Sequence, residues 1–190
     1  MVPVLIAGLL AMVAGVVIGP RFIEALRARN LGQQIRAEGP STHLVKQGTP
    51  TMGGLLIVAG AVLPFLALSQ YTVEGLTVLV IVLGCAAIGF TDDYLKVRRR
   101  HSLGLPGRWK MLFIAAVTIV AAILLQQSET FDTSVYVPLV GLDIELSYAY
   151  YPFLFILIAG TVNGSNLTDG IDGLLAGTAT IMLLTFLAIV

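Results

Sequence analysis

The sequence predicts an all-α protein, a polytopic transmembrane helix bundle of about six helices with its N-terminus outside the cell. Three observations predict this fold class: the composition, the long apolar runs and the placement of the basic residues. Of the 190 residues, 57% are hydrophobic and 12% are charged, and the mean hydropathy is +0.92. Soluble domains carry about 25% charged residues. The composition therefore excludes a disordered chain, a nucleic-acid-binding module and an ordinary water-soluble domain.

Long apolar runs recur along the whole chain, and each is the expected core of one helix. They are Val2–Gly19, Met52–Ser69, Gly75–Phe90, Met111–Leu125, Ala149–Val162 and Leu174–Val190. About 20 helical residues cross a hydrocarbon core about 30 Å thick, so the polar flanks of the shorter runs should lie at an interface or a cavity. The alternative, buried helices of a soluble protein, would leave almost no amphipathic surface for water. We expect residues 1–190 to form a single membrane domain.

The basic residues predict how this domain is oriented. All eleven Lys and Arg residues lie in two connections, after the first run and after the third run. The connections after the second and fourth runs contain none. This alternation follows the positive-inside rule and places both basic connections in the cytoplasm. The first run lacks a preceding basic region, so we interpret it as an inserted helix rather than a signal peptide.

The first basic connection ends in a turn rich in glycine and proline, with the sequence HLVKQGTPTMGG over His43–Gly54. Lys46 in this turn can contact a phosphate as a point charge. The alternative is a simple return loop with one lysine that extends toward the interface.

The second basic connection carries the sequence GFTDDYLK over Gly89–Lys96. The adjacent carboxylates of Asp92 and Asp93 stand at the negative end of a helix dipole, where a compensating positive charge is expected. Lys96 is four residues after Asp92 and three after Asp93, so it can supply this positive charge. Mg²⁺, which prefers one or two carboxylates plus substrate phosphate, is a second candidate. A solvated ion-pair cluster without function is the alternative. Further on, Arg108 and Lys110 can help to hold a pyrophosphate.

The third inward-facing connection reads NGSNLTDGIDG over Asn163–Gly173. The side chains of Asn163, Asn166, Asp169 and Asp172, beside a glycine-rich backbone, can hydrogen-bond a base or a ribose, and the helix that follows favours phosphate at its N-terminus. Simple capping of that helix by Asp172 is the alternative.

These three motifs, in this order and on alternating connections, resemble those of the bacterial phospho-N-acetylmuramoyl-pentapeptide transferases. That family belongs to the wider superfamily of polyprenyl-phosphate sugar-1-phosphate transferases. The resemblance implies a reaction in which phospho-MurNAc-pentapeptide passes from UDP-MurNAc-pentapeptide to undecaprenyl phosphate, with release of UMP and a requirement for Mg²⁺. It also implies a multi-pass protein of the bacterial plasma membrane with a cytoplasmic active site, and a homodimer is a possible assembly.

The resemblance implies roles for individual residues. Asp92, Asp93 and Lys96 would be catalytic, with Asp92 activating the lipid phosphate and Asp93 close to the metal. The substrate-binding residues would be Lys46, Lys110, Asn163, Asn166, Asp169 and Asp172.

Members of this family are longer and carry a further metal-binding aspartate and a histidine-rich motif beyond the matched part. We therefore expect this chain to be an N-terminal part with an incomplete active site. A GlcNAc-1-phosphate transferase of the same superfamily and a membrane transporter are the alternatives. A transporter predicts charges near the bilayer midplane, whereas the charges here lie at the ends of the apolar runs or in the connections.

Overall fold

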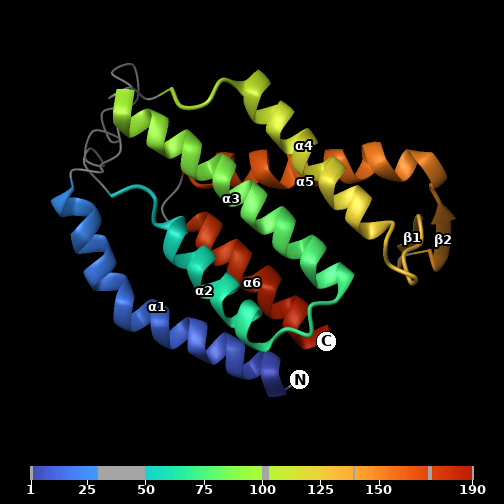
Figure 1. Ribbon diagram of the computed structural model, residues 1–190, viewed down its shortest axis with the longest axis horizontal. Helices are drawn as coiled ribbons and strands as arrows, with labels where there is room; N and C mark the ends of the chain where they lie inside the picture. Colours follow the sequence, from blue (N-terminus) through green and yellow to red (C-terminus); the bar gives the residue numbers. More distant parts are fainter. Residues whose placement is uncertain (1, 30–49, 100–102, 139, 171–172, 190) are drawn as a thin grey trace. The chain divides into compact units, whose positions relative to one another are not determined.

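The computed structural model describes residues 2–29, 50–99, 103–138, 140–170 and 173–189. Over these residues it is all-α apart from one small hairpin, which confirms the predicted fold class (Figure 1). The elements are α1 (Val2–Ala28), α2 (Gly54–Leu68), α3 (Val73–Arg99), α4 (Gly107–Leu125), β1 (Ser134–Val137), β2 (Leu142–Glu145), the 3-10 helix η2 (Ser147–Ala149), α5 (Tyr150–Thr168) and α6 (Leu174–Ile189).

These elements form two compact units, each described here by itself. The first unit, Val2–Ser128, contains α1 to α4, and the second, Glu129–Val190, contains the hairpin, η2, α5 and α6.

Three helices of the described part, α1, α3 and α4, are long and apolar enough to cross a membrane. The helices α2 and α6 are apolar but shorter. Large apolar side chains cover the outer faces of these helices; Val16, Ile57 and Ile119, for example, are 72%, 75% and 59% exposed. Surfaces of this kind suit lipid rather than water. The predicted membrane-helix character is thus confirmed, whereas the orientation with the N-terminus outside stays a prediction.

In the first unit, neighbouring helices pack in chain order, α1 on α2, α2 on α3 and α3 on α4. Figure 1 shows α1 and α3 running in the same direction, with α2 antiparallel between them. The buried residues of these two helices include Thr77 and Ile88 of α3 and Ile114 and Thr118 of α4. Both threonine hydroxyls donate to backbone carbonyls one turn earlier, which satisfies their polar groups inside an apolar layer.

Gly84 determines how closely α3 and α4 approach. A Cβ atom on this residue would lie only 3.0 Å from Cγ1 of Val117 and closer still to Cγ2. Small residues at such positions let helices in a membrane pack closely and gain van der Waals contact. The start of α3 and the end of α4 are also joined, because the Ser128 hydroxyl donates to the Glu74 carboxylate.

Several helices extend beyond the apolar runs that predicted them. The first run ends at Gly19, but α1 continues through Pro20 to Ala28. Likewise α3 continues through the acidic pair to Arg99, and α5 continues to Thr168. Arg, Lys and Leu have good helix propensity, so a helix can persist after its sequence becomes polar. As a result, the charged side chains of α1 and α3 lie on ordered helix ends.

The second unit opens with a hairpin that the sequence analysis did not predict. Its strands pair antiparallel, with Ser134 opposite Glu145 and Val137 opposite Leu142. Gly141 has φ +66°, a backbone conformation that favours glycine. Each strand has only four residues, which is too short for a clear period-two pattern. Just before β1, the hydroxyl and backbone N–H of Ser134 donate to the carboxylate of Asp132 and lower its pKa.

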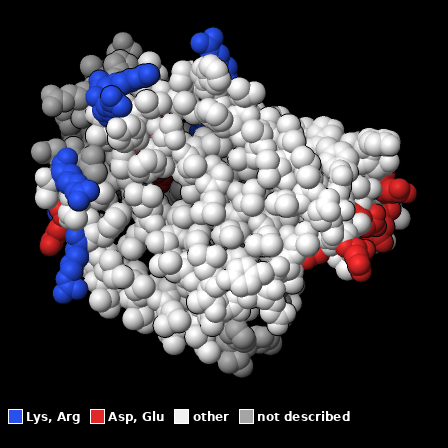
Figure 2. Space-filling view, in the orientation of Figure 1, with Lys and Arg blue, Asp and Glu red and all other residues white. Residues whose placement is uncertain are grey.

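The first unit contains all the described Lys and Arg residues together with several acidic ones, whereas the charged residues of the second unit are all acidic. In Figure 2 the basic side chains of the first unit appear near helix ends, and acidic side chains gather on the second unit. In the first unit the basic residues with described positions are Arg21, Arg27 and Arg29 toward or just after the end of α1, Lys96, Arg98 and Arg99 in the last turn of α3, and Arg108 and Lys110 at the start of α4. In the second unit the acidic residues around the hairpin are Glu129, Asp132, Asp143 and Glu145. Since α1 and α3 run in the same direction, their basic ends point the same way, as the positive-inside rule requires.

Candidate functional site

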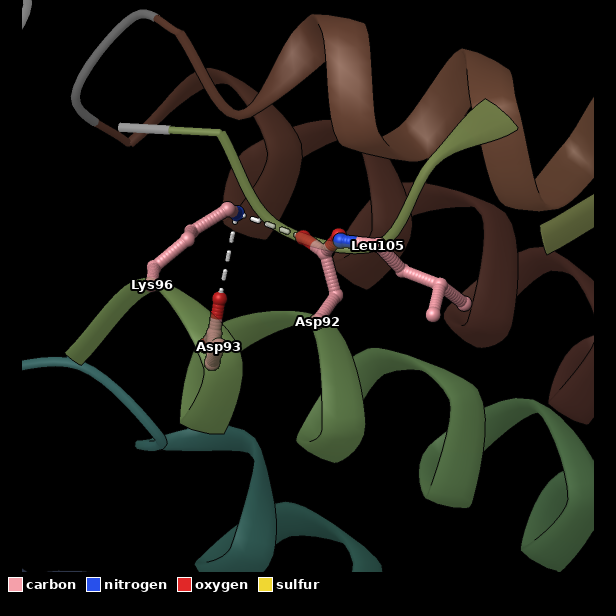
Figure 3. A network of polar contacts seen from close by, with 4 residues as sticks. All are labelled: Asp92, Asp93, Lys96 and Leu105. Atoms are coloured by element: carbon pink, nitrogen blue, oxygen red, sulfur yellow. Dashed lines mark hydrogen bonds and ion pairs between the residues drawn. The ribbon is translucent and has the colours of Figure 1, made fainter. Parts of the chain in front are cut away.

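Asp92 lies near the C-terminal end of α3, and both of its carboxylate oxygens have a partner (Figure 3). The backbone N–H of Leu105 donates to Oδ1 at 2.7 Å. The ammonium nitrogen of Lys96 lies 2.5 Å from Oδ2. The Asp92 side chain is only 14% exposed, so these contacts replace water around a largely buried carboxylate.

Asp93 is the more accessible carboxylate of the pair. Its Oδ1 lies 3.3 Å from the same Lys96 nitrogen, and its side chain is 34% exposed. Lys96 thus bridges the two carboxylates, as the spacing of three and four residues predicted. Two carboxylates and one ammonium leave one negative charge on the cluster Asp92–Asp93–Lys96, hereafter the acidic cluster.

The position of the acidic cluster at the end of a helix has an electrostatic cost. Carboxylates are disfavoured at the C-terminal end of a helix dipole, whereas cations are favoured there. Lys96, Arg98 and Arg99 lie in the last turn of α3 and offset both the dipole and the paired negative charges. The expected need for a compensating positive charge is therefore met within the helix itself.

The turn Gly104–Pro106, between α3 and α4, covers the acidic cluster on one side. A Cβ atom on Gly104 would lie 2.7 Å from the carboxyl carbon of Asp92 and 2.9 Å from its backbone oxygen. Only a residue without a side chain leaves space for this approach. Gly104 and Leu105 were not among the predicted site residues, although the glycine and proline of GLPG signal a turn there. No sequence pattern shows that a backbone N–H in that turn reaches a side chain 13 residues earlier.

The donor chemistry of the acidic cluster fits a hard divalent cation in one respect. Asp93 offers a partly exposed carboxylate, the ligand type that Mg²⁺ prefers. Among the described residues, however, no group of three or more His, Cys, Asp or Glu side chains could hold a metal. Asp93 could therefore hold Mg²⁺ only together with ligands from outside this cluster, such as substrate phosphates and water.

The predicted nucleotide-binding residues with described positions lie at the end of α5 in the second unit. Asn163 and Asn166 belong to the last turns of the helix, and Asp169 caps it. This corrects the expectation that Asn163–Gly173 is a connection throughout, because α5 does not end until Thr168. The Asn163 amide donates to the Ala159 carbonyl at 2.8 Å, and Asn166 and Asp169 are exposed. Residues three apart lie on the same side of a helix, so Asn166 is the neighbour of both Asn163 and Asp169 at this helix end.

The remaining predicted residues are distributed as follows. Lys110 lies in the first turn of α4, half-buried, shortly after the Gly104–Pro106 turn. Lys46 and Asp172 lie outside the described residues. The structure thus brings Asp92, Asp93 and Lys96 together in the first unit, and groups Asn163, Asn166 and Asp169 in the second.

Two family models match the chain. The model for glycosyl transferase family 4 matches residues 75–190, which is more than half of the chain and includes the acidic cluster and all of α5. A signature of phospho-N-acetylmuramoyl-pentapeptide transferases matches residues 46–58. That second match covers much of the glycine- and proline-rich turn singled out in the sequence.

Curated relatives agree with both models. The chain is 41% identical over 180 residues to the phospho-N-acetylmuramoyl-pentapeptide-transferase of Shouchella clausii, a match that covers 91% of this chain and 54% of the relative. It is 40% identical over 183 residues to the protein of the same name from Caldanaerobacter subterraneus, covering 96% and 57%. The corresponding protein of Rubrobacter xylanophilus is 37% identical, covering 100% of this chain and 59% of the relative. The chain therefore spans a little more than half the length of the curated relatives that it matches.

The resemblance carried by the three sequence motifs is confirmed by these matches, and the chain belongs to glycosyl transferase family 4.

Proposed function

We propose that this chain contributes to a membrane transferase that moves phospho-MurNAc-pentapeptide from UDP-MurNAc-pentapeptide to undecaprenyl phosphate in peptidoglycan synthesis. The observation that carries the proposal is the similarity, at about 40% identity over more than nine tenths of the chain, to proteins named for this activity. The signature over residues 46–58 supports the muramoyl-pentapeptide branch. The alternative GlcNAc-1-phosphate transferase has no comparable support among these matches.

In the proposed reaction, an oxygen of undecaprenyl phosphate attacks the sugar-linked phosphorus of the UDP-sugar. The new P–O bond forms as the bond to the UMP phosphate oxygen breaks, and UMP leaves with that electron pair. Transfers of this kind depend mainly on positioning and on neutralising charge. A site for such transfers must therefore hold several negatively charged groups close together and offset the repulsion among them.

The acidic cluster can perform part of this task. The Asp92 carboxylate has about four acceptor sites, of which Leu105 and Lys96 use two, so it can still accept a proton or hydrogen bond from the acceptor phosphate. Lys96, partly exposed between the carboxylates, is placed to attract a phosphate oxygen. These are our proposed roles for Asp92 and Lys96.

Asp93, with substrate phosphates, would hold Mg²⁺. When bound, the metal would neutralise charge on the pyrophosphate. Asn163, Asn166 and Asp169 offer amide and carboxylate groups from a helix end and would contact uridine and ribose. Lys46, Lys110 and Asp172 would complete the substrate contacts, and we place the site on the cytoplasmic side of the bacterial plasma membrane.

The test compares two UDP-sugars as substrates. The protein, as its gene encodes it, is purified in detergent and then assayed with undecaprenyl phosphate and Mg²⁺. We expect UMP release from UDP-MurNAc-pentapeptide and none above background from UDP-GlcNAc. The reverse preference would assign the protein to the GlcNAc-1-phosphate branch. Release from neither, with a relative from the same family active in parallel, would overturn the proposal.

A further inference from the structure

We propose that the Gly104–Pro106 turn positions the Asp92 carboxylate for phosphoryl transfer. In this proposal the Leu105 backbone N–H is the positioning donor, and Gly104 lets the turn approach Asp92 closely enough for that bond to form. The inference rests on the function proposed above, but the contact itself can be tested separately from the activity.

Both carboxylate oxygens of Asp92 are held by a partner. Leu105 N–H binds Oδ1 at 2.7 Å, and Lys96 binds Oδ2 at 2.5 Å (Figure 3). A single partner would leave the carboxylate able to rotate, whereas partners on both oxygens fix the plane of the group. Hydrogen bonds to a charged acceptor are also about twice as strong as bonds between neutral groups.

The turn fits closely against Asp92. Gly104 is so close to Asp92 that a methyl group there would overlap the carboxylate and its backbone oxygen. Gly107, three residues later and the first residue of α4, has no neighbouring atom within 4 Å of the equivalent position. Neither glycine has a positive φ, so the space available, not backbone strain, distinguishes them.

Proline and backbone hydrogen bonds restrict the conformation of the turn. Pro106 has φ −56° and ψ 137°, and proline also restricts the residue before it, Leu105, to extended conformations. The Pro106 carbonyl accepts hydrogen bonds from the backbone N–H groups of Trp109 at 2.9 Å and Lys110 at 3.1 Å. These bonds anchor the turn on the first turn of α4.

Because α4 packs against α3 through buried residues, the anchor is a rigid one. The position of the Asp92 carboxylate therefore depends on the packing of α4 against α3, on the turn that α4 anchors, and on the Leu105 hydrogen bond from that turn to Asp92. A displacement of about 1 Å in a reacting group can cost about 100-fold in rate. We expect disruption of the turn to lower turnover while leaving nucleotide binding largely intact.

The main experiment compares Gly104→Ala with Gly107→Ala in the purified protein, using UMP release from UDP-MurNAc-pentapeptide. We expect Gly104→Ala to lower kcat about 10- to 100-fold with KM for the nucleotide changed less than about twofold. Gly107→Ala should leave both constants unchanged. Equal kcat values for the two variants, or a Gly104→Ala defect confined to KM, would overturn the positioning role.

A second pair of variants tests the donor. Leu105→Pro removes the N–H, whereas Leu105→Ala keeps it and removes only the side chain. We expect kcat of Leu105→Pro to be at least about tenfold below that of Leu105→Ala. Equal kcat values would show that the backbone donor does not matter, and they would overturn the proposal even if Gly104→Ala fails to fold.

A thermal-unfolding cycle separates the contact from the activity. Gly104→Ala should lower Tm less in an Asp92→Ala background than in the wild-type background, because the carboxylate that it overlaps is then missing. An equal decrease in Tm in both backgrounds would contradict the close contact between Gly104 and the Asp92 carboxylate. If the cycle shows coupling but the wild-type protein releases no UMP, the proposed function fails and the contact between the turn and Asp92 stands.

Discussion

The ammonium nitrogen of Lys96 lies 2.5 Å from Oδ2 of Asp92, one helical turn earlier on α3. The same nitrogen lies 3.3 Å from Oδ1 of Asp93. One cation therefore stabilises two adjacent carboxylates at the helix end that least favours them. This arrangement makes the net charge of the acidic cluster depend on Lys96, and it gives the first prediction.

Replacing Lys96 with Met should leave two adjacent negative charges without their shared partner. We expect UMP release to fall about 100-fold, because the cluster then repels phosphate. Lys96→Arg should recover part of this activity because it restores the charge with a different geometry. Steady-state kinetics on both variants test the prediction, and a Met variant as active as the Arg variant would contradict it.

Replacing Asp92 with Asn should abolish UMP release without preventing membrane insertion. The Asn side-chain oxygen can still accept the Leu105 N–H, so the turn should stay in place while the charge is lost. The control is Asp143→Asn, an exposed change on β2, which should keep full activity. Membrane fractionation and UMP release measure the two properties. Near-normal turnover of Asp92→Asn would remove Asp92 from the proposed role.

Removing Mg²⁺ with excess EDTA should stop the reaction, and added Mg²⁺ should restore it. Asp93→Asn should raise the Mg²⁺ concentration for half-maximal activity by about 10-fold or more, since one carboxylate ligand is lost. The measurement is a Mg²⁺ titration of UMP release for the wild type and the variant. Activity that persists in EDTA would refute the metal assignment, and identical titrations would remove Asp93 from it.

Gly84→Ala should destabilise the first unit by about 1–3 kcal/mol, because the added methyl group overlaps Val117 across the α3–α4 contact. Gly89→Ala is the matched control on the same helix, since a methyl group there meets nothing within 4 Å. Thermal unfolding in detergent should show a lower Tm for the first variant only. Val117→Ala in the Gly84→Ala background should recover part of the loss, and failure of this rescue would point to another cause.

Cysteine labelling should test the predicted orientation of the helices. In a Cys85→Ser background, Tyr71→Cys and Asp132→Cys should react with an impermeant maleimide added to intact cells, whereas Arg99→Cys and Asp169→Cys should be protected. Arg99 follows the acidic cluster and Asp169 follows the asparagines of α5. Labelling of only one of these two positions would place the two groups on opposite sides of the membrane, and a shared active site could not exist.

Much of the fold could be predicted because the sequence patterns that indicate it, apolar runs and short residue spacings, are local. Each apolar run became a helix, and the membrane character follows directly from hydropathy. The bridging of Asp92 and Asp93 by Lys96 was also predictable, because a helix brings residues three and four apart to the same face. The family resemblance depended on three short motifs that can be recognised without any structure.

Other features depend on contacts between segments distant in sequence. Helix ends were misplaced because hydropathy marks where a helix leaves the apolar layer, whereas backbone hydrogen bonding decides where it stops. The hairpin was missed because its strands are stabilised by each other rather than by a long pattern of their own.

Local sequence patterns were enough to predict the fold class, the membrane helices, the acidic cluster and the family. Only the tertiary structure showed that the Leu105 N–H holds Asp92 and that Gly104 leaves room for this contact. The physical reason is that a helical repeat relates only near neighbours, whereas the backbone of a turn reaches a distant carboxylate only after α3 and α4 have packed together.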